Sequence, residues 1–154
     1  MRLSQSLTIA ICISSLVCAS GQTESRSALM PENAWHQISQ YFADSTKPTG
    51  SWQPSKRDLD ALESHLAAIS KLKSEGGIRG ARIPHPELSH RQYFAIIVSG
   101  KRLIFINAFQ FDNDPSSLWR QQLYVIGDSG RSVWRVLYDP GTGEFSHLNT
   151  NGVG

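Results

Sequence analysis

The chain has 154 residues, with 15 Lys and Arg, 13 Asp and Glu, two Cys and a formal net charge of +2. This length predicts one domain and excludes large enzyme scaffolds, because a (β/α)₈ barrel needs about 250 residues. The small charge argues against nucleic acid as a partner, since nucleic-acid binding normally needs a concentrated basic face. The 40% hydrophobic and 9% aromatic fractions are typical of a folded domain rather than a disordered chain.

Residues 1–21 have the pattern of a secretory signal peptide. Arg2 supplies a short positive region, and an apolar run of 11 residues follows over 7–17. Small residues after this run suit signal peptidase, so cleavage is expected after Ala19 or Gly21. The run is too short to cross a membrane, which takes about 20 residues. We therefore expect a protein exported to the periplasm or secreted; a buried N-terminal helix is the alternative interpretation.

Both cysteines, Cys12 and Cys18, lie in this segment. Cleavage would leave a mature chain without thiols, and hence without a disulfide or a cysteine nucleophile. A lipid anchor through Cys18 is not expected, because Ser15 and Val17 stand where a lipidation signal has leucine and a small residue. No later apolar run approaches membrane-spanning length, so no transmembrane segment is expected in the mature chain.

Residues 22–30 are polar, and we interpret them as a flexible leader before a single domain over 31–154. Apolar residues at helical spacing predict a first amphipathic helix over about 32–43. A second, stronger helical pattern follows, capped at its start by Ser55 and Asp58. Its apolar face carries Leu59, Leu62, Leu66, Ile69 and Leu72.

The second half consists of short runs of branched and aromatic residues separated by turn residues, which predicts an antiparallel meander. The expected strands are 91–99, 103–111, 118–126, 132–138 and 144–148. Gly100-Lys101 is a candidate hairpin turn of the glycine-first type. Both alternating sets of the first strand are apolar, so this strand should be central and covered on both sides. The predicted fold class is α+β, with two N-terminal helices packed on a curved antiparallel meander of about five strands.

Two short patterns resemble catalytic or metal sites. Gly127-Asp128-Ser129-Gly130 spells part of the serine motif of chymotrypsin-like proteases, but Arg131 stands where those proteases have another glycine. We interpret this segment as a hairpin turn. The other pattern combines His85 and His90 with Asp112 and Asp114, and it lacks the glycine and glutamate of a calcium-binding loop. We interpret it as a solvated loop, and no catalytic residue, metal or cofactor is predicted.

Aromatic and basic residues supply the candidate binding surfaces. The residues predicted to bind a ligand are Trp52, Arg91, Tyr93, Trp119, Tyr124 and Trp134. The aromatic residues among them, together with Tyr138, could form a platform for sugar or peptide, because aromatic faces suit such ligands. The alternative is that they fill the core. Five arginines lie on or beside strands and could form an anion-seeking sheet face, or stay solvated. These are Arg91, Arg102, Arg120, Arg131 and Arg135.

The second half also contains a C-terminal Trp…Tyr-Asp-Pro…Gly…Phe…Asn-Gly pattern. Its residues are Arg91-Gln92-Tyr93-Phe94, Gly100, Ile104–Asn107, Trp119, Trp134, Tyr138-Asp139-Pro140, Gly143, Phe145, Leu148 and Asn151-Gly152, with Trp52, Asp58 and Leu62-Glu63 upstream. As a set they resemble a group of small, exported, uncharacterised bacterial proteins. This resemblance implies export and an α+β domain, and it implies no catalytic residue.

The leading functional hypothesis is a non-enzymatic exported module that binds a protein or envelope ligand, for example as an inhibitor or immunity-type protein. It rests on a small sheet domain with aromatic and arginine residues and no recognisable catalytic set. The first alternative is a small hydrolase or lyase that uses His85 or His90 with Asp112. The second is a structural component of the cell envelope.

Overall fold

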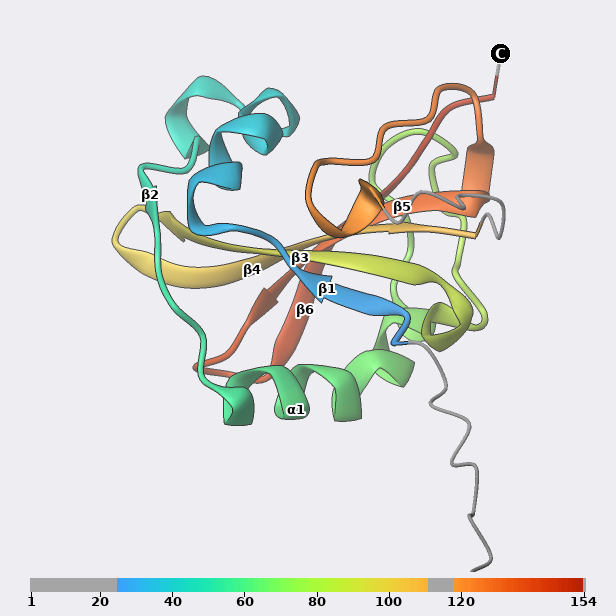
Figure 1. Ribbon diagram of the computed structural model, residues 1–154. Helices are drawn as coiled ribbons and strands as arrows, with labels where there is room; N and C mark the ends of the chain where they lie inside the picture. The colour runs from blue at the N-terminus through green and yellow to red at the C-terminus, as the bar shows by residue number, and fades with distance from the viewer. Residues whose placement is uncertain (1–24, 111–117, 154) are drawn as a thin grey trace, which may run out of the picture.

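The computed structural model describes residues 25–110 and 118–153, which form one α+β unit (Figure 1). The predicted signal peptide, both cysteines, and Asp112 and Asp114 lie outside these ranges. The predicted α+β class is confirmed, but the predicted arrangement of two N-terminal helices on a five-stranded antiparallel meander is not. A six-stranded sheet lies between α1 on one face and the helical segments that follow β1 on the other. None of the helices in the described ranges has the length and apolar character that a membrane crossing requires.

The sheet is mixed rather than purely antiparallel. Its strands are β1 (Ser27–Leu29), β2 (Gly50–Ser51), β3 (His90–Val98), β4 (Lys101–Phe109), β5 (Val133–Asp139) and β6 (Glu144–Thr150). From β3 to β6 the strands pair antiparallel in chain order, as the predicted meander requires. At the other edge, β1 pairs in parallel with the first half of β3, and β2 pairs antiparallel with its second half.

The predicted flexible leader over 22–30 is wrong for residues 27–29, which form β1. The unpaired edge of β3 supplies the reason, since its backbone groups need hydrogen-bond partners. Arg91 donates its amide to the Arg26 carbonyl at 2.8 Å, and the Met30 amide donates to the Tyr93 carbonyl at 2.9 Å. A three-residue edge strand has almost no periodic pattern, so its polar sequence did not reveal it.

The predicted strand over 118–126 is also wrong. The chain there forms a short 3-10 helix, η5 (Leu118–Arg120), followed by an irregular segment. Buried side chains take the place of a neighbouring strand: the Tyr124 amide donates to Gln92 Oε1 at 2.9 Å, and the Tyr124 carbonyl accepts from Asn107 Nδ2 at 2.9 Å. Because these polar side chains are buried, they need hydrogen-bond partners, and the irregular backbone supplies them. β4 therefore pairs with β5 rather than with a strand over 118–126.

Local sequence signals explain the helical segments. α1 (Lys56–His65) begins at a complete capping box, in which the Asp58 amide donates to Ser55 Oγ at 3.2 Å and Asp58 Oδ2 accepts from the Ser55 amide at 2.7 Å. The Ser55 hydroxyl also donates to Asp58 Oδ2 at 2.7 Å, and the hydrogen bonds that this carboxylate accepts from the Ser55 hydroxyl and amide lower the pKa of Asp58. The chain continues as the 3-10 helix η3 (Leu66–Lys71). The segment predicted as a regular helix over 32–43 is a 3-10 helix, η1 (Glu32–Tyr41), which still buries its apolar side. The remaining 3-10 turns are η2 (Asp44–Thr46), η4 (Pro86–Leu88) and η6 (Gly130–Ser132).

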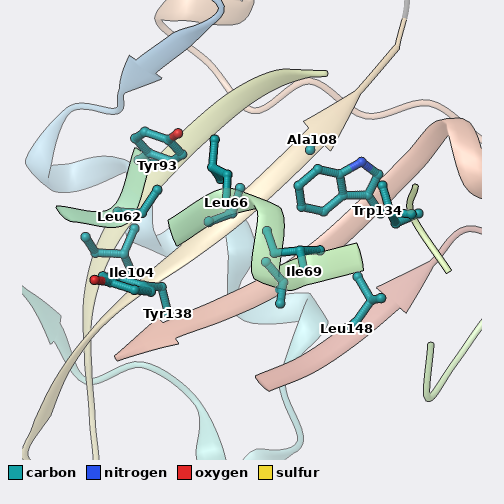
Figure 2. Packing of buried hydrophobic residues seen from close by; sticks show 12 residues of the cluster. Leu62, Leu66, Ile69, Tyr93, Ile104, Ala108, Trp134, Tyr138 and Leu148 are labelled. Carbon is teal, nitrogen blue, oxygen red and sulfur yellow. The ribbon is translucent and has the colours of Figure 1, made fainter. Parts of the chain in front are cut away.

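The core has a layer on each face of the sheet. α1 and η3 place Leu62, Leu66 and Ile69 against β4, β5 and β6, with Trp134 among them (Figure 2). On the other face, η1 places Ala34 and Ile38 against apolar residues of β3 and β4. β3 contributes to both layers, so the predicted central strand with two covered faces is confirmed.

The hairpin between β3 and β4 turns one residue earlier than predicted. Val98 pairs with Lys101, so the two central residues are Ser99 and Gly100. Their φ angles are 50° and 77°. Positive φ at both central residues is the geometry of a type I′ turn, whose twist matches that of the strands.

Candidate ligand-binding pocket

The three tryptophans predicted as a platform do not form a shared exposed patch. Trp134 is 0% exposed and lies in the core under α1, whereas Trp119 is 5% exposed and packs with Phe109 in a separate cluster. Trp52 is half-buried, and its Nε1 donates to the Leu103 carbonyl at 3.0 Å. Burial of two of the three rings leaves the platform without a surface.

Tyr124 is half-buried and its ring lies 4.4 Å from that of Phe109. The other two predicted residues, Arg91 and Tyr93, are buried in a network with Glu63 of α1. Arg91 Nε donates to the Tyr93 hydroxyl at 2.9 Å, and that hydroxyl donates to Glu63 Oε1 at 2.6 Å. Arg91 Nη2 also lies 3.1 Å from Glu63 Oε2. The network joins α1 to β3. In this structure the contacts of Arg91 and Tyr93 therefore stabilise the packing of the helix on the sheet.

This network predicts a loss of stability at alkaline pH. Burial raises the pKa of Tyr93 above its ordinary value near 10, and the nearby Glu63 adds to the rise although Arg91 opposes it. Above about pH 10 the unfolded chain therefore loses a proton that the folded chain keeps, so the free energy of unfolding should fall as the pH rises. Urea denaturation at about pH 9 and pH 11 measures this fall. Tyr93→Phe should make it shallower, and an unchanged pH slope in that variant would contradict the assignment.

The predicted acid–base group does not come together among the described residues. The His85 side chain is 67% exposed, and its Nδ1 lies 3.3 Å from Glu87 Oε1. His90 is half-buried against the rings of Phe109 and Trp119. Asp112 lies outside the described ranges. No three His, Cys, Asp or Glu side chains within those ranges are placed to hold a metal ion.

The protease-like segment is a bend rather than the predicted hairpin turn, because no strand directly precedes it. Asp128 has a positive φ of 49°, and the Ser129 hydroxyl donates to the Gly127 carbonyl at 2.8 Å. The hydroxyl is thus used within the bend itself.

A pocket of about 550 Å³ opens on the face of the sheet opposite α1, between residues 41–46 and strands β4, β5 and β6. We call it the β4–β6 pocket. Its apolar wall consists of Tyr41, Phe42, Val98, Leu103, Phe105 and Leu137. The rings of Tyr41 and Phe105 lie nearly parallel, with centroids 5.8 Å apart. This volume and this apolar lining are typical of sites that hold small organic ligands.

A few polar side chains line the same pocket: Thr46, Lys101, Arg135, Asp139, Ser146, His147 and Asn149. The acid among them, Asp139, uses Oδ1 to accept the Gly141 amide at 2.8 Å. His147 Nδ1 lies 3.1 Å from Glu75 Oε2. Both side chains are thus held by groups of the protein, and Arg135 stands out among the charged lining residues.

Arg135 is a half-buried cation that has no carboxylate partner in the part of the chain that the structure describes. Its Cζ lies 4.1 Å from the ring centroid of Tyr41, and Nη1 donates to Asn151 Oδ1 at 2.8 Å. Its Nε is buried and has no hydrogen-bond acceptor among the described residues. Burial lowers the pKa of Arg135, and Tyr41 opposes this shift. The guanidinium remains charged at neutral pH, so its contacts with neutral groups leave the charge uncompensated.

Strand register places Arg135 in a polar row across an otherwise apolar face. Gln92 pairs with Asn107, Asn107 with Arg135, and Arg135 with Asn149. Directly paired residues point to the same face, so the row extends from β3 to β6. The sequence marked Arg135 as one of five arginines beside strands, but it could not identify the pocket, because the aromatic wall comes from a distant segment.

Comparison of the chain with protein-family models, with curated proteins and with solved structures finds no match.

Proposed function

We propose that this chain is an exported, non-enzymatic binding module whose small envelope ligand occupies the β4–β6 pocket. The observation that carries the proposal is the pocket itself, with about 550 Å³ of space and an aromatic wall from Tyr41, Phe42 and Phe105. Ligand sites are concave and mostly apolar with a few oriented polar groups, and this pocket has that composition. The signal-peptide pattern of residues 1–21 supports export.

The position of the pocket also favours binding. Its floor is formed by the central part of the sheet, where β4 and β5 are held from the other side by α1 and η3. A rigid floor loses little conformational freedom when a ligand binds, so more of the contact energy appears as affinity. One wall, residues 41–46, comes from the end of η1 and from η2 rather than from the sheet, and the rings of Tyr41 and Phe42 pack on Phe105 of the core.

The test is to fill the pocket. Ala43 lines it, is exposed, and has an extended backbone that accepts any side chain. Ala43→Trp should weaken binding of the uncharged dye Nile red, measured by fluorescence titration, about tenfold, since losing about 1.4 kcal/mol of apolar contact corresponds to that factor. The matched control is Ala67→Trp, which adds the same ring to an exposed position of η3 on the opposite face. Equal dye affinity in the two variants would overturn the proposal.

A further inference from the structure

We infer that the ligand of the β4–β6 pocket is an amphipathic carboxylate, a small organic acid whose carboxylate pairs with Arg135 and whose apolar body packs on the aromatic wall. The inference rests on the proposed function and specifies its ligand class. Three features of the pocket lead to it: a cation without a counter-ion, a positive balance of charge, and an apolar volume next to that cation.

The first feature is the charge of Arg135. An ion pair requires a nitrogen–oxygen distance of at most 4.0 Å. Within the described ranges, no Asp or Glu oxygen lies that close to a guanidinium nitrogen of Arg135. A partly buried charge that lacks a partner destabilises the fold unless a ligand supplies one. Arg91, which is buried, shows the contrast, because it pairs with Glu63 at 3.1 Å. Arg135 therefore has the position of a binding residue, whereas Arg91 has that of a structural one.

The second feature is the remaining charge of the lining. Lys101 adds a second cation, and Asp139 is the acid of the lining. Asp139 Oδ1 is hydrogen-bonded to the Gly141 amide, which holds its carboxylate in the β5–β6 turn. The pocket thus favours an anion over a cation or a zwitterion. Asn149, which pairs with Arg135 across the strands and also lines the pocket, offers a polar neighbour for the same anion.

The third feature is the shape of the site. Arg135 Cζ lies 4.1 Å from the centroid of the Tyr41 ring, and that ring also stacks with Phe105, so the cation lies next to the apolar wall. A guanidinium forms planar hydrogen-bonded pairs with a carboxylate, and stacking on an aromatic ring holds its plane. A ligand with a carboxylate at one end and an aromatic or alkyl body would fill both parts of the pocket.

The experiment compares two probes that differ in charge and little in shape, 4-phenylbutanoate and 4-phenylbutanamide, by calorimetric titration. The unchanged protein should bind the carboxylate at least about tenfold more tightly than the amide, because hydrogen bonds to charged groups are the stronger ones. Arg135→Gln should weaken carboxylate binding by about tenfold to a hundredfold and leave amide binding within about twofold. Arg131→Gln, which removes the same charge from an exposed position outside the pocket, should change neither affinity.

Equal affinities of the two probes for the unchanged protein would overturn the inference, and this comparison does not depend on the folding of any variant. An equal loss for both probes in Arg135→Gln would overturn it as well, because Arg135 would then only support the pocket wall. Nile red separates the two proposals. If Ala43→Trp weakens dye binding but the unchanged protein binds the carboxylate and the amide equally well, the ligand class is wrong and the binding function stands. If the dye is insensitive, the proposed function itself fails.

Discussion

Replacing Trp134 with alanine is expected to lower the free energy of unfolding by about 3–5 kcal/mol. The indole is 0% exposed and lies near Ala108, Ile69 and Leu148 in the core between the sheet and the helical segments α1 and η3 (Figure 2). Its Nε1 also donates to Ser89 Oγ at 3.1 Å, so truncation leaves both a cavity and a buried hydroxyl without its donor. Urea denaturation followed by circular dichroism measures the change.

The matched control for this prediction is Trp52→Ala. Trp52 is half-buried at the margin of the same cluster, so its removal opens a smaller cavity and should cost clearly less. The loss of stability in Trp134→Phe should lie between the losses in Trp134→Ala and Trp52→Ala, because phenylalanine keeps most of the volume and loses the hydrogen bond to Ser89. If Trp134→Ala loses no more stability than Trp52→Ala, the burial of Trp134 in the core is contradicted.

Gly77→Ala is expected to be the second most damaging change, with a loss of about 2–5 kcal/mol. Gly77 has a φ of 64°, a left-handed conformation that costs any other residue about 1–2 kcal/mol. A Cβ at this position would also overlap the carbonyl oxygen of Thr150 at the end of β6. Since that neighbour is backbone, relief requires the strand end to move, and thermal or urea denaturation should report the loss.

Gly80→Ala is the control that separates these two causes. Gly80 also has a positive φ, 80°, but nothing lies within 4 Å of the place its Cβ would take. It should therefore lose only the conformational part, about 1–2 kcal/mol. Equal losses in the two variants would contradict the close approach between Gly77 and Thr150.

The Gly77 contact bears on the pocket as well as on stability. The Thr150 amide donates to the Ser74 hydroxyl at 3.0 Å, and the Ile78 amide donates to Thr150 Oγ1 at 2.9 Å, so the segment around Gly77 fastens the end of β6. Asn149, the residue before Thr150, lines the β4–β6 pocket and pairs with Arg135. A shift of this strand end in Gly77→Ala is expected to reduce probe binding too, whereas Gly80→Ala should leave binding unchanged.

The α+β class, α1 with its capping box, and the hairpin strands from β3 onwards could be predicted from the sequence alone. Those elements have strong local causes. Apolar residues recur at the helical spacing from Leu59 to Leu72, and strand-forming residues alternate between turn residues. Two of the failures, β1 and the segment 118–126, are places where the local pattern is weak or is overridden by a tertiary partner. In the second, aromatic and branched residues suggested a strand, but Tyr124 donates its amide to buried Gln92 and accepts a hydrogen bond from buried Asn107, and these bonds hold an irregular chain.

The candidate site shows the same division more sharply. Sequence reasoning chose binding residues by type, and of these Trp119, Trp134, Arg91 and Tyr93 are buried. It named Arg135 only among other arginines, since the charge of a side chain is visible in a sequence but its burial and its partners are not. The sequence by itself determined which residues alternate on each strand, because side-chain period is a property of the backbone. Only the tertiary structure decided that Arg135 lines a pocket without an ion-pair partner among the described residues while Arg91 pairs with Glu63, because the partners of a charge come from segments that only folding brings together.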